Sequence, residues 1–171
     1  MEVEVLSTKL SWGFNTLVAP VEVCRDCVED YINNYRFLTL YICGNRSQVL
    51  GKIRGKIWVK RGFTIYQLIK ILLDAYEDVL FVEHDPMVAG EIEFSDVEDF
   101  ALLLRQVGRE KLLIYFSSAR DQFFDLIANY ADRLIWVEED ARCYRVFDVS
   151  REGVRESIYL KDPLQLTLEI F

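Results

Sequence analysis

Short apolar runs alternate along the chain with longer stretches in which apolar residues recur every three or four positions. The runs have the length and the β-branched or aromatic content of buried strands, and they cover residues 15–20, 37–43, 79–82, 112–116 and 134–137. The helical spacing covers residues 23–36, 64–76, 94–107 and 121–130, and Thr64 is a suitable N-cap for the second of these helices. This alternation predicts an α/β fold in which a parallel sheet is flanked by helices.

The pattern changes after Asp140, where three short alternating segments follow one another without room for helices between them. These segments, residues 144–149, 157–160 and 164–171, predict an antiparallel extension of the sheet. Residues 3–6 also alternate like a strand, and they pair either within their own sheet or with the edge of a partner. Because no long linker divides the 171 residues, we expect a single domain over 1–171, with its core at about 12–140 and the antiparallel strands at 141–171.

The chain has a formal net charge of −8, but its cations are concentrated in one window. Residues 46–70 contain seven Lys or Arg side chains and no acid, which leaves a charge of −15 for the rest of the chain. Cations interleaved with aromatic residues are typical of grooves that bind single-stranded nucleic acid. The residues expected to make such contacts are Lys52, Arg54, Lys56, Trp58, Lys60 and Arg61. The overall acidity predicts weak, salt-sensitive binding, and the preferred interpretation of this window is a solvated hairpin whose cations balance a neighbouring acidic surface.

The apolar runs are far shorter than the roughly 20 residues that span a bilayer. The N-terminus alternates charge with valine and lacks a basic segment followed by an apolar one, as a signal sequence would have. We therefore expect a cytoplasmic protein without membrane association, in which the four cysteines are reduced.

Several strings resemble the RecA/RadA/KaiC-like branch of the P-loop ATPases. Residues 12–20, WGFNTLVAP, are similar to the lead into that family's phosphate loop, and residues 79–83, VLFVE, stand where its Walker B strand belongs. Residues 38–42, 59–68 and 130–135 are similar to its second strand, the entry to its next helix and the ADR string of its fifth strand. The resemblance extends from about residue 12 to residue 137 and implies a RecA-like parallel sheet with an antiparallel extension.

The residues that carry nucleotide chemistry are the ones that depart from this family. A phosphate loop needs the pattern G-x-x-x-x-G-K-[ST], because glycines let backbone N–H groups surround phosphate, the lysine neutralises it and the hydroxyl binds magnesium. Residues 21–27, VEVCRDC, contain no glycine, lysine or hydroxyl, and the second strand ends in Cys43 and Gly44 rather than in acids. Glu83 and Asp85 remain as a Walker B remnant. We therefore expect neither ATPase activity nor a cofactor.

The cysteines suggest a second kind of chemistry. Cys24 and Cys27 form a C-x-x-C motif at the start of an expected helix, where the helix dipole lowers a thiol pKa. Because the ends of parallel strands share one edge, these two thiols would meet Cys43 and His84 there, and zinc accepts such a donor set. The spacings match no compact zinc ribbon, so reduced packing thiols are the preferred interpretation. A redox pair or disulfide and a structural zinc site are the alternatives.

Together these features predict a non-catalytic RecA-like paralogue that acts as an accessory subunit in DNA recombination or repair. Its expected partner is a protein, either a RecA-like ATPase or a second copy of the chain. One alternative is a divalent-metal phosphoesterase that uses Glu83 and Asp85. Another is a weak single-stranded nucleic-acid binder that uses residues 46–61.

Overall fold

The computed structural model describes residues 2–6, 8–35, 37–89 and 93–161. Over these residues its strands are β1 (Val3–Val5), β2 (Thr8–Leu10), β3 (Gly13–Val18), β4 (Thr39–Cys43), β5 (Trp58–Arg61), β6 (Val79–Glu83), β7 (Leu112–Ser117), β8 (Arg133–Glu139), β9 (Cys143–Ser150) and β10 (Gly153–Leu160). The helices are α1 (Val21–Asn34), α2 (Ile65–Leu73), α3 (Phe94–Gly108) and α4 (Gln122–Ala128), with short 3₁₀ turns η1 (Leu50–Lys52) and η2 (Pro86–Ala89). The chain is thus a mixed α/β protein, as its hydrophobic pattern predicts.

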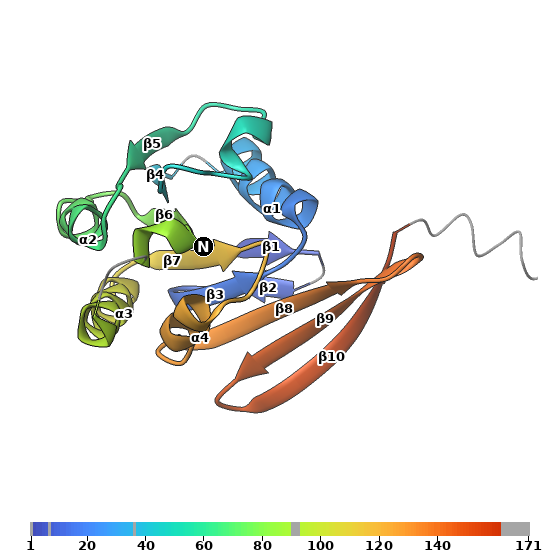
Figure 1. Ribbon diagram of the computed structural model, residues 1–171. Coiled ribbons are helices and arrows are strands. Elements are labelled where there is room, and N and C mark those ends of the chain that lie inside the picture. Colours follow the sequence, from blue (N-terminus) through green and yellow to red (C-terminus); the bar gives the residue numbers. More distant parts are fainter. Residues whose placement is uncertain (1, 7, 36, 90–92, 162–171) are drawn as a thin grey trace, which may run out of the picture.

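A single large sheet organises the described residues (Figure 1). Its strand order is β10-β9-β8-β3-β7-β6-β4-β5, and the six strands from β8 to β5 run parallel to their neighbours. β9 and β10 are antiparallel additions beside β8, which confirms the antiparallel extension over these two strands. The segment expected at 164–171 lies outside the described residues.

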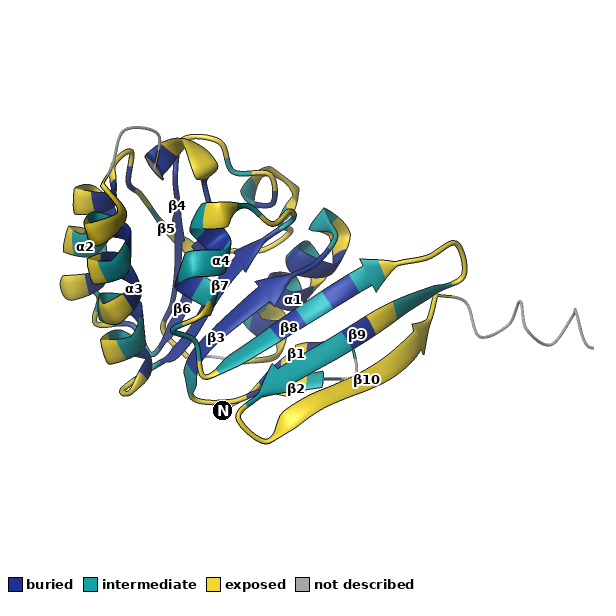
Figure 2. Ribbon diagram, turned by 60° about the horizontal axis from the view of Figure 1, so that its bottom comes forward, coloured by how far each residue is buried: buried dark blue, intermediate teal, exposed yellow. Residues whose placement is uncertain are grey.

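Helices pack on both faces of the parallel strands. α1 and the β1–β2 hairpin contribute to a core cluster on one face, and α2, α3 and α4 contribute to a cluster on the other (Figure 1). β4, β6 and β7 are buried at every position because they have helices or loops on both sides. β9 and β10 extend beyond the helices, and β10 is exposed along its whole length (Figure 2).

The element boundaries follow local chemistry. Thr64 caps α2 as predicted, since its side chain accepts a hydrogen bond from the Gln67 N–H group. Asp121, expected as the first residue of its helix, instead caps α4 by accepting from the N–H group of Phe124. The second strand begins later than predicted, because its pairing with β6 starts at Thr39 opposite Val79.

The structure corrects one expectation about strand pairing and decides another. The solvated hairpin considered for the basic window is wrong: this segment forms the turn η1 and then the edge strand β5, which lies parallel to β4. Residues Val3–Val5 pair antiparallel with β2 in a hairpin of their own, outside the large sheet. Their valines are buried against α1, so this strand is part of the fold.

No helix within the described residues is long and apolar enough to cross a membrane.

Candidate functional site

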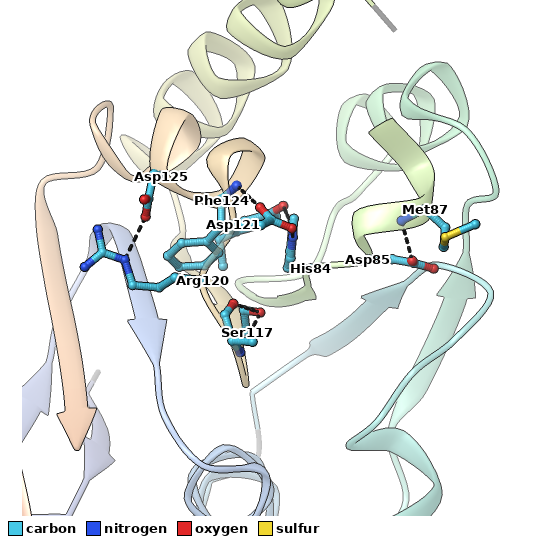
Figure 3. Close-up of polar contacts among 10 residues, drawn as sticks. His84, Asp85, Met87, Ser117, Arg120, Asp121, Phe124 and Asp125 are labelled. Carbon is cyan, nitrogen blue, oxygen red and sulfur yellow. Dashed lines mark hydrogen bonds and ion pairs between the residues drawn. The ribbon is translucent and has the colours of Figure 1, made fainter. Parts of the chain in front are cut away.

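A cleft opens at the carboxyl end of the parallel strands, between the segments that follow β6 and β7. It has a volume of about 290 Å³, and both cations and carboxylates line it, among them Arg46, His84, Asp85, Arg120 and Asp121. In open α/β sheets this edge is where ligands bind. Figure 3 shows His84 turned toward Asp121, while Asp85 lies apart from them and is turned toward Met87. Asp85 and His84, the single histidine of the chain, therefore lie at one edge, as the sequence predicts.

Glu83, the last residue of β6, is buried, and both of its carboxylate oxygens accept hydrogen bonds. Oε1 accepts from the backbone N–H groups of Gln48 at 2.7 Å and Val49 at 3.1 Å. Oε2 accepts from the Tyr41 hydroxyl at 2.7 Å and from the Ser47 hydroxyl. A buried carboxylate needs such donors, because without them it loses its hydration uncompensated. Glu83 thus holds the loop after β4 against the sheet.

Asp85 holds the beginning of the same loop. Its Oδ2 accepts hydrogen bonds from the N–H groups of Asn45 at 2.9 Å and Arg46 at 3.2 Å, and its Oδ1 accepts from Met87 N–H at 2.9 Å. Gly44 is required beside it, since a Cβ atom there would lie only 2.2 Å from Asp85 Oδ2. Glu83 and Asp85 therefore bind backbone and hydroxyl groups of their own chain. Together, their contacts include every residue from 45 to 49.

His84 is held between two polar partners. Its Nδ1 lies 2.6 Å from the Tyr115 hydroxyl, and its Nε2 lies 2.8 Å from Asp121 Oδ2. Burial, followed by the charges of Asp121 and Asp85, raises the pKa of Tyr115 well above its ordinary value. The phenol therefore stays protonated, so the Tyr115 hydroxyl is the hydrogen-bond partner of Nδ1 while Nε2 bonds to Asp121. Both ring nitrogens are occupied, so this histidine has no free nitrogen for a metal.

The place expected for a phosphate loop is a very short connection. β3 ends at Val18 and α1 begins at Val21, so only Ala19 and Pro20 join them. Ala19 donates its N–H to the Ser117 carbonyl at 3.1 Å, which continues the pairing with β7, and Pro20 has no N–H group. Glu22 is the acidic residue of the first helical turn. This two-residue connection offers no loop that could surround a phosphate group.

The three thiols of the proposed zinc set are buried and form no disulfide. Their burial limits the sulfur chemistry that they could support. Burial, together with the charge of Glu83, raises the pKa of Cys24 to about 12, and burial raises the pKa of Cys43 to about 11. The pKa of Cys27 is also well above its usual value, again because of burial. No group of three or more His, Cys, Asp or Glu side chains is placed to hold a metal ion anywhere in the described part of the chain. The thiols pack in the core cluster beside α1.

The residues expected to contact nucleic acid on β5 do not all face the same side of the sheet. Lys52 lies 3.8 Å from Glu22, and the Arg61 guanidinium donates to the carbonyls of Gly44 and Asn45 at 3.5 Å. Along β5, Trp58 and Lys60 alternate with Arg61 and therefore point to the opposite face of the sheet. Lys52, Arg54 and Lys56 precede the strand. Trp58 is the most exposed aromatic residue of the set, at 72%.

Sequence reasoning missed the partners of the acids and of the histidine. Ser47 and Gln48 lie in a polar loop without a motif, and Tyr115 lies in an apolar run that indicates only a buried strand. The one signal available for Asp121 was its place at the start of a helix, because the side chain of an N-cap residue is fixed there by the N–H groups of the first turn.

The fold and this edge define an α/β protein in which the carboxylates of Glu83 and Asp85 accept hydrogen bonds from its own backbone. Comparison with known families finds no family model that matches the chain. An uncharacterized protein of Archaeoglobus fulgidus is 46% identical over 171 residues, which cover 99% of this chain and 88% of the archaeal protein. The chain belongs to the same family as that archaeal protein.

The hydrogen bonds of Glu83 can be tested by removing one donor. We expect Tyr41→Phe to lower the free energy of unfolding by about 1.5–3 kcal/mol, the range for a hydrogen bond to a charged group. Glu83→Gln should lower the free energy of unfolding further, because the amide N–H₂ group must face donors instead of accepting from them. Tyr66→Phe is the matched control, since the Tyr66 hydroxyl bonds Asp96 at an exposed position. Urea denaturation measures all three, and equal losses for Tyr41→Phe and Tyr66→Phe would contradict this role of Glu83.

The buried thiols predict a simple labelling pattern. In the native protein at pH 8, Ellman's reagent should react rapidly with one thiol, that of the partly exposed Cys143. Cys24, Cys27 and Cys43 should react only after unfolding, because they are buried and their raised pKa values keep them protonated. Cys143→Ser should therefore remove the fast phase. A fast phase that survives this substitution would instead support a reactive C-x-x-C pair.

Proposed function

We propose that this chain is a RecA-like domain that has lost its ATPase site and acts as a non-catalytic accessory subunit in DNA recombination or repair. Five parallel strands, each followed along the chain by a helix or by the antiparallel extension, support the RecA-like assignment together with the edge strand β5. The matching strings also occupy the expected places: the first leads into the end of β3, and VLFVE is β6.

The single observation that carries the proposal is the two-residue connection between β3 and α1. β3 and β7 are neighbours, but α1 and α4, which follow them, pack on opposite faces of the sheet. This is a topological switch point, the place where open α/β sheets bind nucleotides. Here Ala19 continues the strand pairing and Pro20 is the N-cap of the helix, so the connection contains no glycine-rich loop that could surround phosphate.

The retained acids support the same proposal. A magnesium ligand must offer free oxygen lone pairs, whereas the oxygens of Glu83 accept four hydrogen bonds and those of Asp85 accept three. Binding a metal at these oxygens would release residues 45–49 from the sheet. This disfavours the phosphoesterase alternative, and it gives the acids a structural role that survives the loss of the nucleotide.

A domain without a nucleotide must contact its partner without one. Large apolar side chains on and near β5 and α2 are exposed, which is typical of surfaces that bind other proteins; they are Trp58, Phe63, Tyr66, Leu73 and Tyr76. The cations of the same window would favour an acidic partner surface. We propose a RecA-like ATPase or a second copy of the chain as the partner, in the cytoplasm.

Nucleotide binding tests the first half of the proposal. Titration calorimetry with ATP and magnesium should detect no binding tighter than about 100 μM, which corresponds to roughly −5.5 kcal/mol. A RecA-type ATPase with an intact phosphate loop serves as the positive control under the same conditions. Saturable binding tighter than this limit would contradict the loss of the site.

Partner capture tests the second half. The full-length tagged chain should recover a RecA-like ATPase, or untagged copies of itself, from source lysate treated with apyrase and EDTA. Recovery should be unchanged when magnesium and ATP are added back, because this chain contributes no nucleotide to the contact. Recovery of neither, or capture that requires ATP to bind this chain, would overturn the accessory role.

A further inference from the structure

Among the described residues, β10 is an edge strand of the large sheet. It pairs with β9 on one side, and no described strand pairs with it on the other. All eight of its residues are exposed, and Figure 2 shows it at the outer margin of the molecule. Four of them are large apolar residues, Val154, Ile158, Tyr159 and Leu160, with Val154 and Ile158 exposed to more than 60%.

Such an edge is suited to pairing with a further strand. An edge strand that is exposed along its whole length presents a row of unpaired N–H and C=O groups. Natural proteins usually protect long apolar edges with lysines, prolines or bulges. β10 has no lysine, no proline and only two charged residues, Arg155 and Glu156. Its pairing with β9 is continuous from Gly153 to Leu160, so no bulge turns the edge away.

Two copies of the same edge can pair only in certain registers. A two-fold axis perpendicular to the sheet makes the two strands antiparallel and brings together residues of the same face. Two such registers pair seven residues of β10 with seven of its copy, one centred on Glu156 and the other on Ser157. The first sets two glutamates directly opposite each other, which is destabilising.

The register centred on Ser157 has no like charges in opposition. It sets Val154 opposite Leu160 of the second copy, and Arg155 opposite Tyr159 of the second copy. An aliphatic pair and a cation beside an aromatic ring both stabilise cross-strand contacts. The remaining pair sets Glu156 opposite Ile158 of the second copy, so two of the three kinds of cross-strand pair in this register are favourable and none is repulsive.

We propose that two copies of this chain associate through β10, antiparallel and centred on Ser157, so that their sheets join into one. This deepens the proposed function, on which it rests only for the idea of a nucleotide-independent protein contact, since it names a second copy as the partner. The dimer contact needs neither ATP nor metal. Tight ATP binding would overturn the lost site and leave this dimer standing, so the two proposals fail separately.

A cysteine at the two-fold axis tests the register. In a full-length Cys143→Ser background, Ser157→Cys places two thiols directly opposite each other, with Cα atoms about 4.5–5.5 Å apart, within reach of a disulfide. Glu156→Cys is the matched control, because its two copies would be offset by two residues along the strands, about 8 Å apart. Under glutathione disulfide we expect Ser157→Cys to form a covalent dimer at least tenfold faster than Glu156→Cys. Equal rates would overturn this register.

Sedimentation tests the association without any cross-link. The unmodified chain should sediment as a dimer at 100 μM, and Ser157→Glu should shift it to a monomer because two carboxylates then oppose each other. Ser157→Thr should remain a dimer, and an unchanged circular dichroism melt would show that Ser157→Glu is still folded. A monomeric unmodified chain, or a dimer that Ser157→Glu leaves intact, would overturn the proposal.

Discussion

A carboxylate that is buried at the end of a strand must be given hydrogen-bond donors, and this requirement organises the carboxyl edge of the sheet. Glu83 obtains its donors from Tyr41 in the neighbouring strand and from residues 47–49 in the loop beyond it. The loop in turn has no regular secondary structure before η1, so the carboxylate substitutes for the ladder bonds it lacks. Asp85 extends this arrangement by two residues and requires glycine at position 44. η1 and β5 follow this loop, so these contacts fix the point from which they start.

This edge has the form of a ligand site but uses its polar groups internally. His84 is bracketed by Tyr115 and Asp121, and Asp121 also caps α4, so one chain of contacts links β6, β7 and the helix that follows. At the switch point the connection from β3 to α1 is reduced to two residues. A sheet of this topology can lose its ligand without losing stability when the carboxylates that faced the ligand acquire backbone donors instead. The loss of the nucleotide site that we propose would leave Glu83 and Asp85 with this structural role.

Much of the fold follows from periodicity, and most of the site does not. The parallel strands are buried on both faces, so their apolar runs are continuous and easily recognised, and the shift to alternation after Asp140 marks the antiparallel strands. Thr64 was recognisable as a cap because capping depends on residues a few positions apart. By contrast, Glu83 and Asp85 bond to amides more than 30 residues away, and a backbone amide leaves no trace in a sequence pattern.

The same limit applies to pairing. The alternation of residues 3–6 and of the basic window indicated extended strands, yet neither their partners nor their direction could be inferred from it. β1 pairs with β2 in its own hairpin, and β5 became a parallel edge strand because η1 returns the chain to the side of β4. For β1, the burial of its valines against α1 decides which face turns inward, and this depends on the whole fold.

The state of the two retained acids is open to one direct measurement. Manganese broadens the amide signals of nuclei close to it, so a ¹H–¹⁵N spectrum of the labelled protein with millimolar Mn²⁺ and ATP reports on the carboxyl edge residue by residue. If Glu83 and Asp85 serve only to hold their own chain, the signals of Ala19, Gln48 and Val49 will keep their positions and widths. Selective broadening of these signals at concentrations that leave the rest of the spectrum sharp would contradict the loss of the nucleotide site.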